Sequence, residues 1–305
     1  MPLTSGAAAY APLVLTSPRR LVLVHAHPDD ETLWTGGTIA RYAAAGVQVT
    51  LLTCTLGEQG EVLPAELRGL AADRADQLGG YRVGELRAAC AALGVTEQRF
   101  LGGLGRWRDS GMVSEPGSRA SVPHDLDPRA FAAGNQAEQV QALVAVLAEL
   151  RPQVVVSYGP DGGYGHPDHI RAHQVTMAAV AQVPEVARVF WAVQPVSAVT
   201  EGIAALHAMP GLPFPLPASD GLPGVADAEV TTRLDVTAHR AAVLVALSAH
   251  ATQLRVWTDG PHQAFALADG VARPVLDTEH LTLVRGPEQG AHDGLFGGLP
   301  GPAAR

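Results

Sequence analysis

The sequence contains no lysine, because all 21 of its basic residues are arginine. A Schiff base or a lysine nucleophile is therefore excluded. Cysteine is almost absent as well: Cys54 and Cys90 lie far apart, in stretches that predict a strand and a helix. This argues against a disulfide framework, and we expect both thiols to be buried as small apolar side chains.

Clustered positive charge and long apolar runs are also missing. The net charge is −9 and the arginines are scattered, so the basic surface that nucleic-acid binding needs is absent. No run approaches the roughly 18 apolar residues of a membrane span. The mildly apolar residues 7–15 precede Arg19 and Arg20, whereas a signal peptide carries its positive charges first. We therefore expect a cytoplasmic protein without nucleic-acid or membrane partners; the sequence does not indicate its oligomeric state.

The apolar patterns predict a parallel sheet. Continuously apolar, β-branched runs predict buried strands over 21–24, 49–52, 99–101 and 154–156. Helical patterns between them cover 35–45, 83–93 and 127–150. Gly46 and Gly94 close the first two helices, and Asp127 is expected to cap the third. Alternating strands and helices predict the fold class α/β: a Rossmann-like, doubly wound, mostly parallel sheet with a smaller C-terminal α+β lobe.

The C-terminal third is less regular. Residues 209–224 are too rich in proline and glycine for regular structure, and the patterns after them predict a strand over 229–236, a helix over 237–255 and a hairpin over 265–285. We divide the chain into a Rossmann-like catalytic domain over 1–195, a lobe completing the substrate pocket over 196–290 and a flexible tail over 291–305.

Two short segments combine imidazole and carboxylate groups directly after predicted strands. The first runs from His27 through Asp29 to Asp30, and the second runs from Tyr164 through His166 to His169. In open parallel sheets, ligands bind beyond the carboxyl ends of the strands, where the strand order reverses. If the first and fourth predicted strands are neighbours there, the two segments face one another and form one site.

These groups match an open metal site. A catalytic zinc ion takes about three His, Asp or Glu ligands and leaves a position for water. The spacing His-x-x-Asp lets His27 and Asp30 converge, while Asp29 is free to accept a proton from water, whose pKa the metal lowers. In the second segment, the spacing does not show which imidazole is the metal ligand: His166, His169 or, one helical turn later, His173. One imidazole binds the metal, and the other stabilises the developing oxyanion as imidazolium.

Three other interpretations fit parts of this pattern. The polar residues could be helix caps and loop groups whose hydrogen bonds are satisfied. A single short motif of this kind often arises by chance, but two motifs that each follow a strand do so less often. A structural zinc site is usually closed and rich in cysteine. Two histidines and one carboxylate also hold iron in oxygenases, but Asp29 then has no evident task. His250 is expected to be a satisfied core or rim residue.

At these residues the chain resembles the PIG-L/LmbE family of zinc-dependent deacetylases acting on N-acetylglucosaminyl groups, and within it the mycothiol-biosynthesis subgroup. The segments 27–31 and 162–169 carry the resemblance, supported by 53–57, 77–86, 105–112 and 249–253. It implies that His27, Asp30 and His169 bind the metal, that Asp29 is the general base and acid, and that His166, oriented by Asp168, stabilises the transition state. It further implies that Tyr164 contacts the intermediate, that Arg82 and Asp109 bind sugar and inositol hydroxyls, and, less directly, that Glu61 and Gln253 belong to the site.

The resemblance also implies an activity. This is hydrolysis of the acetamide of 1D-myo-inositol 2-acetamido-2-deoxy-alpha-D-glucopyranoside, a small amino-sugar inositol, to the free amine and acetate. It implies one Zn²⁺ per subunit, although Fe²⁺ also suits two histidines and an aspartate. The alternative is the related amidase of mycothiol S-conjugates, a subgroup that tends to carry proline where this chain has Gly165.

Overall fold

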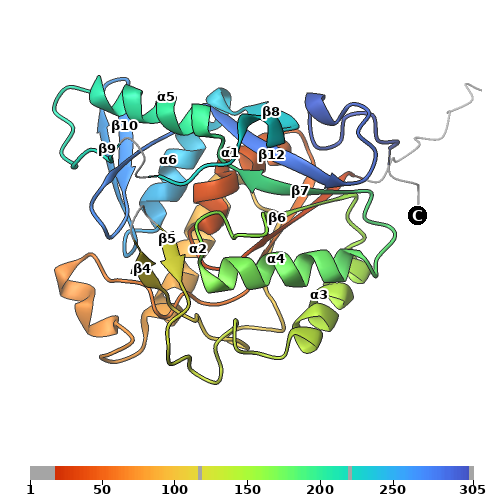
Figure 1. Cartoon of the computed structure of the whole chain (residues 1–305), viewed down its shortest axis with the longest axis horizontal. Coiled ribbons are helices and arrows are strands. Elements are labelled where there is room, and N and C mark those ends of the chain that lie inside the picture. Colours follow the sequence, from red (N-terminus) through yellow and green to blue (C-terminus); the bar gives the residue numbers. More distant parts are fainter. Residues whose placement is uncertain (1–17, 116–118, 219–221, 302–305) are drawn as a thin grey trace, which may run out of the picture.

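A seven-stranded sheet, with the strand order β3-β2-β1-β6-β7-β12-β8, forms the centre of the molecule (Figure 1). The computed structural model describes residues 18–115, 119–218 and 222–301, so the stretch 7–15 lies outside it. The strands are β1 (Arg20–His25), β2 (Gln48–Thr53), β3 (Glu97–Phe100), β6 (Val154–Tyr158), β7 (Arg188–Val193), β8 (Thr232–Asp235) and β12 (Thr278–Arg285). The first five are parallel, and β12 is antiparallel to β7 and β8. The predicted α/β fold with a mostly parallel sheet is confirmed.

The strand order reverses between β1 and β6. β1 pairs with β2 on one side and with β6 on the other, so the first and fourth predicted strands are neighbours. Because both strands are parallel, the loops after His25 and after Tyr158 leave from the same edge of the sheet. The expected meeting place of the two segments is therefore confirmed.

Helices cover both faces of the sheet (Figure 1). Successive β1 residues point to opposite cores: Leu21 and Leu23 pack with α1, α2 and α6, whereas Val22 and Val24 pack with α3 and α4. This alternation follows from the two-residue period of a strand. The helix bounds are α1 (Asp30–Ala44), α2 (Leu78–Leu93), α3 (Gln136–Leu150), α4 (Pro167–Val180) and α6 (Arg240–Ala249).

Several predicted boundaries are wrong. α1 begins at Asp30 rather than residue 35, and α2 begins five residues before the predicted start. α3 begins at Gln136 because the side chain of Asn135 accepts hydrogen bonds from the first turn; Asp127 instead accepts from the N–H of Arg129, within a turn. The predicted helix 237–255 ends at residue 249, and a strand follows it.

A carboxylate from the antiparallel part of the sheet stabilises a kink in α1. Thr35 has φ −144° and ψ 15°, which interrupts the helical hydrogen bonds. Glu279 of β12 accepts hydrogen bonds from the N–H groups of Gly37 and Thr38, at 2.7 and 2.8 Å. Strand β12 therefore fixes the helix that begins at Asp30, in the first of the two segments.

The remaining elements surround this framework. A three-stranded sheet of β9 (Arg255–Asp259), β10 (His262–Ala266) and β11 (Ala272–Pro274) packs near α5 (Val196–His207), and β4 (Val113–Glu115) pairs with β5 (Arg119–Ser121). Short 3₁₀ helices cover Ala65–Leu70, Asp227–Glu229, Thr237–His239 and Ala291–Asp293. Within the described parts of 209–224 there is neither helix nor strand, as predicted. Of the predicted hairpin 265–285, β10 and β11 form one, whereas β12 joins the main sheet.

The described part of the C-terminal segment contributes side chains to the core. The expectation of a flexible tail from residue 291 is wrong for its described part, since Ala291, Leu295, Phe296 and Leu299 are buried in the core that also contains α1. The division at residue 195 stays a prediction, and β8 and β12 continue the sheet across it. Among the residues described, no helix is both long enough and apolar enough to span a membrane.

Candidate metal and catalytic site

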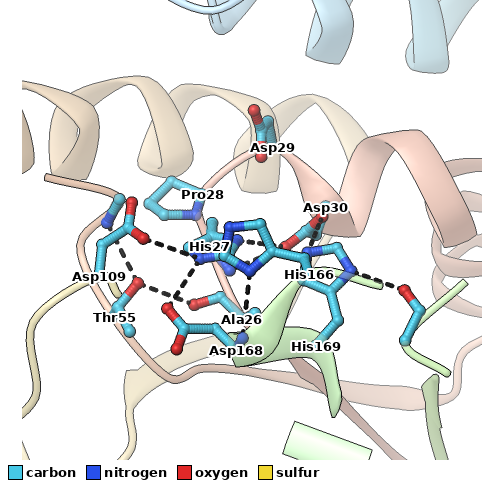
Figure 2. A network of polar contacts seen from close by, with 12 residues as sticks. Ala26, His27, Pro28, Asp29, Asp30, Thr55, Asp109, His166, Asp168 and His169 are labelled. Carbon is cyan, nitrogen blue, oxygen red and sulfur yellow. Dashed lines mark hydrogen bonds and ion pairs between the residues drawn. The ribbon is translucent and has the colours of Figure 1, made fainter. Parts of the chain in front are cut away.

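Each of the two segments connects a strand to a helix at the same edge of the sheet. The chain leaves β1, passes His27 and turns at Asp29 into α1. After β6, the chain reaches His166, whose side chain caps the N-terminus of α4. Figure 2 shows the imidazoles of both segments beside Asp30, with Asp29 set apart above them. The arrangement predicted from the sheet topology is present.

The carboxylate of Asp30 lies between an imidazole from each segment. Its Oδ2 is 3.2 Å from Nδ1 of His27 and accepts a hydrogen bond from the His27 backbone N–H at 2.8 Å. Its Oδ1 is 3.3 Å from Nε2 of His169. That Nε2 is buried and makes no hydrogen bond among the described residues, while Nδ1 of His169 donates to the carbonyl of Gly162 at 3.0 Å. A buried nitrogen lone pair beside a carboxylate is a suitable ligand pair for a cation.

The other nitrogen of His27 faces two more carboxylates. Nε2 lies 3.2 Å from Oδ2 of Asp168 and 3.4 Å from Oδ1 of Asp109, and all three side chains are buried. Burial opposes a charge on His27, but Asp109, Asp168 and Asp30 raise its pKa well above its usual value. Burial also opposes ionisation of Asp109, yet His27 holds the pKa of this carboxyl well below its usual range. A carboxylate behind a ligating histidine fixes the ring and its tautomer.

His166 occupies the third position around the cluster. Its ring centre is 4.5 Å from that of His27 and 5.0 Å from that of His169. Its Nδ1 accepts a hydrogen bond from the backbone N–H of Asp168 at 3.1 Å, so the proton of the neutral ring resides on Nε2. Burial and the neighbouring histidines lower the pKa of His166 well below its usual value. This lowered pKa disfavours the expected imidazolium form of His166.

Within the described part of the chain, distances alone identify two groups that could hold a metal ion. Potential ligand atoms of His27, His166 and His169 lie within 4.8 Å of one another, and so do those of His27, Asp109 and Asp168. His27 belongs to both groups. The structure thus brings together the imidazoles of both segments, and the choice among ligands depends on tautomers and hydrogen bonds.

Asp29 is held by Arg82. The side chain of Asp29 is 14% exposed, and its Oδ2 is 3.1 Å from Nη2 of Arg82. The same guanidinium donates to the carbonyls of Pro28 and, at 2.8 Å, Gly57. Burial raises the pKa of Asp29 to about 6, although Arg82 opposes this change. Arg82, expected at the substrate hydroxyls, is in this structure buried against the turn of the first segment.

The other predicted site residues differ in how far their side chains are buried. The carboxylate of Asp168 faces His27 and accepts hydrogen bonds from the N–H, at 2.8 Å, and the hydroxyl of Ser110; its backbone rather than its carboxylate contacts His166. Tyr164 is half-buried, with its ring centre 5.0 Å from that of His169. Glu61 is exposed, and its carbonyl accepts from Nε2 of Gln253 at 2.9 Å.

Sequence reasoning missed residues that support the rings. Tyr158 stacks on His169, with ring centres 4.2 Å apart, and its hydroxyl accepts from the N–H of Ala26. Ser110 positions Asp168, as described above, and Glu31 contacts His250. The signal available for Tyr158 was its place at the carboxyl end of β6; Ser110 and Glu31 directly follow residues that the sequence did identify.

Substitution of Gly57 by alanine is expected to destabilise the protein by about 2–4 kcal/mol and to lower activity. Gly57 has φ 68°, and a Cβ there would lie 2.1 Å from Nη1 of Arg82, which must then leave Asp29. Gly46 is the matched control, since its φ of 78° is similar but a Cβ would meet nothing within 4 Å. Chemical denaturation and activity assays of both variants measure the difference; equal effects would show that Arg82 is not displaced.

Fold and site together define a Rossmann-like enzyme with a buried His/Asp metal site at the switch point of its sheet. Residues 22–180 match the family model of PIG-L, described as GlcNAc-PI de-N-acetylase. The chain belongs to this family, and it is an enzyme that removes the acetyl group from an N-acetyl substrate.

Close relatives carry one common name. The chain is 62% identical to 1D-myo-inositol 2-acetamido-2-deoxy-alpha-D-glucopyranoside deacetylase 1 of Saccharopolyspora erythraea, over 94% of this chain and 96% of the relative. It is 59% identical to the deacetylase of that name from Actinosynnema mirum, over 95% and 100%.

Solved structures share the fold. The teicoplanin-biosynthesis deacetylase in complex with teicoplanin is 21% identical with a TM-score of 0.51, over 88% of this chain and 100% of that one. The hydratase GalB of Pseudomonas putida KT2440 is 18% identical with the same score, over 88% and 97%. Because these two differ in chemistry, the shared fold does not by itself specify the reaction.

Proposed function

We propose that this enzyme hydrolyses the acetamide of 1D-myo-inositol 2-acetamido-2-deoxy-alpha-D-glucopyranoside and releases acetate and the free amine. The substrate is taken from the names of relatives that match more than 90% of the chain. The observation that carries the reaction is the Asp30 carboxylate between His27 and His169, with a second aspartate adjacent to it in the sequence. A cytoplasmic location and the lack of a nucleic-acid partner stay predictions from the sequence.

His27, Asp30 and His169 are the proposed metal ligands. The hydrogen bond from Nδ1 of His169 to Gly162 leaves Nε2 free to bind, and the carboxylates at Nε2 of His27 leave its Nδ1 free, beside Asp30. Zinc is the proposed metal, and Fe²⁺ suits the same donor set. When bound, the metal lowers the pKa of water and polarises the acetyl carbonyl.

Asp29 and His166 carry the proton transfers and the developing charge. Asp29 takes a proton from the attacking water and later gives it to the leaving amine, a role suited to a carboxyl group with a raised pKa. His166 donates from Nε2 to the oxyanion, and Asp168 orients this ring through its backbone N–H. Tyr164, whose ring centre is 6.1 Å from that of His166, is the proposed second hydrogen-bond donor to this charge.

The substrate hydroxyls require groups at the rim of the site. Of the three proposed contacts, Glu61 is exposed, whereas Arg82 and Asp109 are buried and bonded to the protein. Arg82 contacts Asp29 and Asp109 contacts His27, so their proposed role is to position these two residues rather than to bind the substrate directly. The exposed carboxylate of Glu61 is therefore the proposed direct acceptor for sugar or inositol hydroxyls.

Activity is expected to fall as the pH falls through about 6. The raised pKa of Asp29 means that its carboxyl group becomes protonated in this range and cannot accept a proton. Below the pKa, kcat/KM should decline by about tenfold per pH unit. Because Arg82 lowers the pKa of Asp29, the substitution Arg82→Gln should move this acidic limb to higher pH. Complete pH–rate profiles of the wild-type enzyme and of Arg82→Gln measure the acidic limb and its shift. If the limb stays at the same pH in the variant, it reports the titration of a group other than Asp29.

The proposed function is tested by measuring acetate and free amine released from the named inositol glycoside. Equal amounts of both products are expected, and a chelator should abolish their release. A bulky mycothiol S-conjugate serves as the competing substrate. A higher kcat/KM on the conjugate would make the chain an amidase of that type, and absence of acetate from either substrate would contradict the proposal.

A further inference from the structure

Asp29 has an unusual backbone conformation. Its φ is 118° and its ψ is −31°, whereas the other two described non-glycine residues with positive φ, Asp76 and Arg151, have values near 50°. An L-amino acid adopts such a conformation only when its surroundings impose it. The direction of the Asp29 side chain therefore depends on the groups that hold this turn.

The backbone N–H of Asp29 is held by Glu31. Oε2 of Glu31 accepts its hydrogen bond at 3.0 Å. Oε1 accepts from the hydroxyl of Thr32 at 2.5 Å and faces Nε2 of His250 at 2.7 Å. The carbonyl of Asp29 accepts hydrogen bonds from the backbone N–H groups of Thr32 and Leu33. The N–H of Asp29, in contrast, is held by a side chain.

Glu31 in turn is fixed by His250 from the distant end of α6. Both side chains are fully buried, and Nδ1 of His250 makes no hydrogen bond within the described chain. Among the described residues, the imidazole of His250 is therefore held through Nε2, by its hydrogen bond with Glu31. A buried pair of this kind contributes little to stability after desolvation, but it can select one conformation.

The segment that carries His250 is itself anchored to α2. Glu85 accepts hydrogen bonds from the N–H and hydroxyl of Thr252, at 2.8 and 2.6 Å. Glu85 lies three residues after Arg82, on the same side of the helix. α2 therefore supports Asp29 twice: Arg82 binds its carboxylate directly, and Glu85 fixes the segment that places His250 against Glu31.

We propose that Glu31 and His250 are positioning residues, which hold Asp29 in the conformation that aims its carboxylate at the reacting water. The inference rests on the proposed role of Asp29 as general base. Glu31 and His250 touch neither substrate nor metal in this account, since both oxygens of Glu31 are occupied by Asp29, Thr32 and His250. Their loss should therefore lower kcat without changing KM or the metal content.

Methionine and glutamine at position 31 provide a matched pair of similar size. Glu31→Met removes the acceptor for the N–H of Asp29 and is expected to lower kcat by about 10- to 100-fold, the cost of small misplacements in active sites. Glu31→Gln keeps an acceptor oxygen and should retain most of kcat. Thr232→Val is the control for general destabilisation, because it removes a buried hydrogen bond to the carbonyl of Ala291, on edge strand β8.

Hydrogen exchange in the metal-free protein gives a readout independent of activity. The peptide containing Asp29 should exchange faster in Glu31→Met than in Glu31→Gln or Thr232→Val. His250→Leu and His250→Gln form a second pair, in which glutamine restores a donor toward Glu31; this pair decides the question if Glu31→Met does not fold.

Unchanged kcat in Glu31→Met and His250→Leu would overturn the inference, and so would loss of kcat together with loss of metal. If the wild-type enzyme releases no acetate, the proposed function fails instead, and the exchange rates still show whether Glu31 and His250 hold the turn of Asp29.

Discussion

Replacing His169 by alanine is expected to weaken metal binding on the order of 100-fold or more and to abolish deacetylation. The reason is geometric: Nε2 of His169 is buried, free of hydrogen bonds among the described residues, and 3.3 Å from the carboxylate of Asp30. His166→Ala is the matched control. The ring of His166 lies in the same cluster, with its centre 5.0 Å from that of His169, but its Nδ1 accepts a hydrogen bond from a backbone N–H. That variant should keep its metal and lose turnover.

Metal per subunit, measured after dialysis against a weak chelator, separates the two histidines. Full occupancy in His169→Ala together with loss of metal in His166→Ala would reverse their roles. Loss of metal in both variants would instead select the group of His27, His166 and His169, whose distances alone are also compatible with metal binding. Both imidazoles would then be ligands, and the oxyanion would be without its proposed donor.

Replacing Asp29 by asparagine is expected to reduce kcat on the order of 10³-fold, within the range of general acid–base catalysis. Asparagine has almost the same shape and tolerates positive φ, so the hydrogen bond from its N–H to Glu31 should persist. Metal content should therefore stay unchanged. Substrate affinity should change little, because Asp29 is proposed to act on the attacking water.

Kinetics and metal analysis of Asp29→Asn are interpreted together with Asp30→Asn. The second variant removes charge from the carboxylate between His27 and His169, and it should lose metal as well as activity. If Asp29→Asn retained more than about a tenth of kcat, the loss would be smaller than the effect that a general base typically contributes. Another group would then have to accept the proton.

The location of the site could be predicted from the sequence because it depends on a general property of parallel sheets. Polar residues directly after two apolar strands lie at the carboxyl edge, and the strand reversal makes β1 and β6 neighbours. The pairing of His27 with a residue 139 to 142 positions later follows from this topology alone. The fold class was predictable for the same reason, since strands and helices alternate.

Roles that depend on the direction of a side chain could not be predicted. Arg82 contacts Asp29, and Asp168 contacts His27 and Ser110. In each case the residue lies at the site, but its partner comes from a distant segment whose register only the folded chain sets. The lowered pKa of His166 likewise comes from burial and from two neighbouring histidines.

Helix starts and the C-terminal third were less predictable because tertiary contacts override local preference. Asp127 carries a good cap signal but forms only a turn, while Asn135 caps α3. Apolar residues near the end of the chain, such as Leu295 and Phe296, are surrounded by glycines, yet the core buries them. β12 belongs to the main sheet because its partner is β7 rather than its neighbour in sequence.

The most direct test of the account is a crystal structure of the zinc-loaded protein with an anomalous map recorded at the zinc edge. The account predicts one peak per subunit, about 2.0–2.2 Å from Nδ1 of His27, from an Asp30 oxygen and from Nε2 of His169, with His166 and Asp29 outside the ligand set. A peak bound by His166, or one between His27, Asp109 and Asp168, would contradict it.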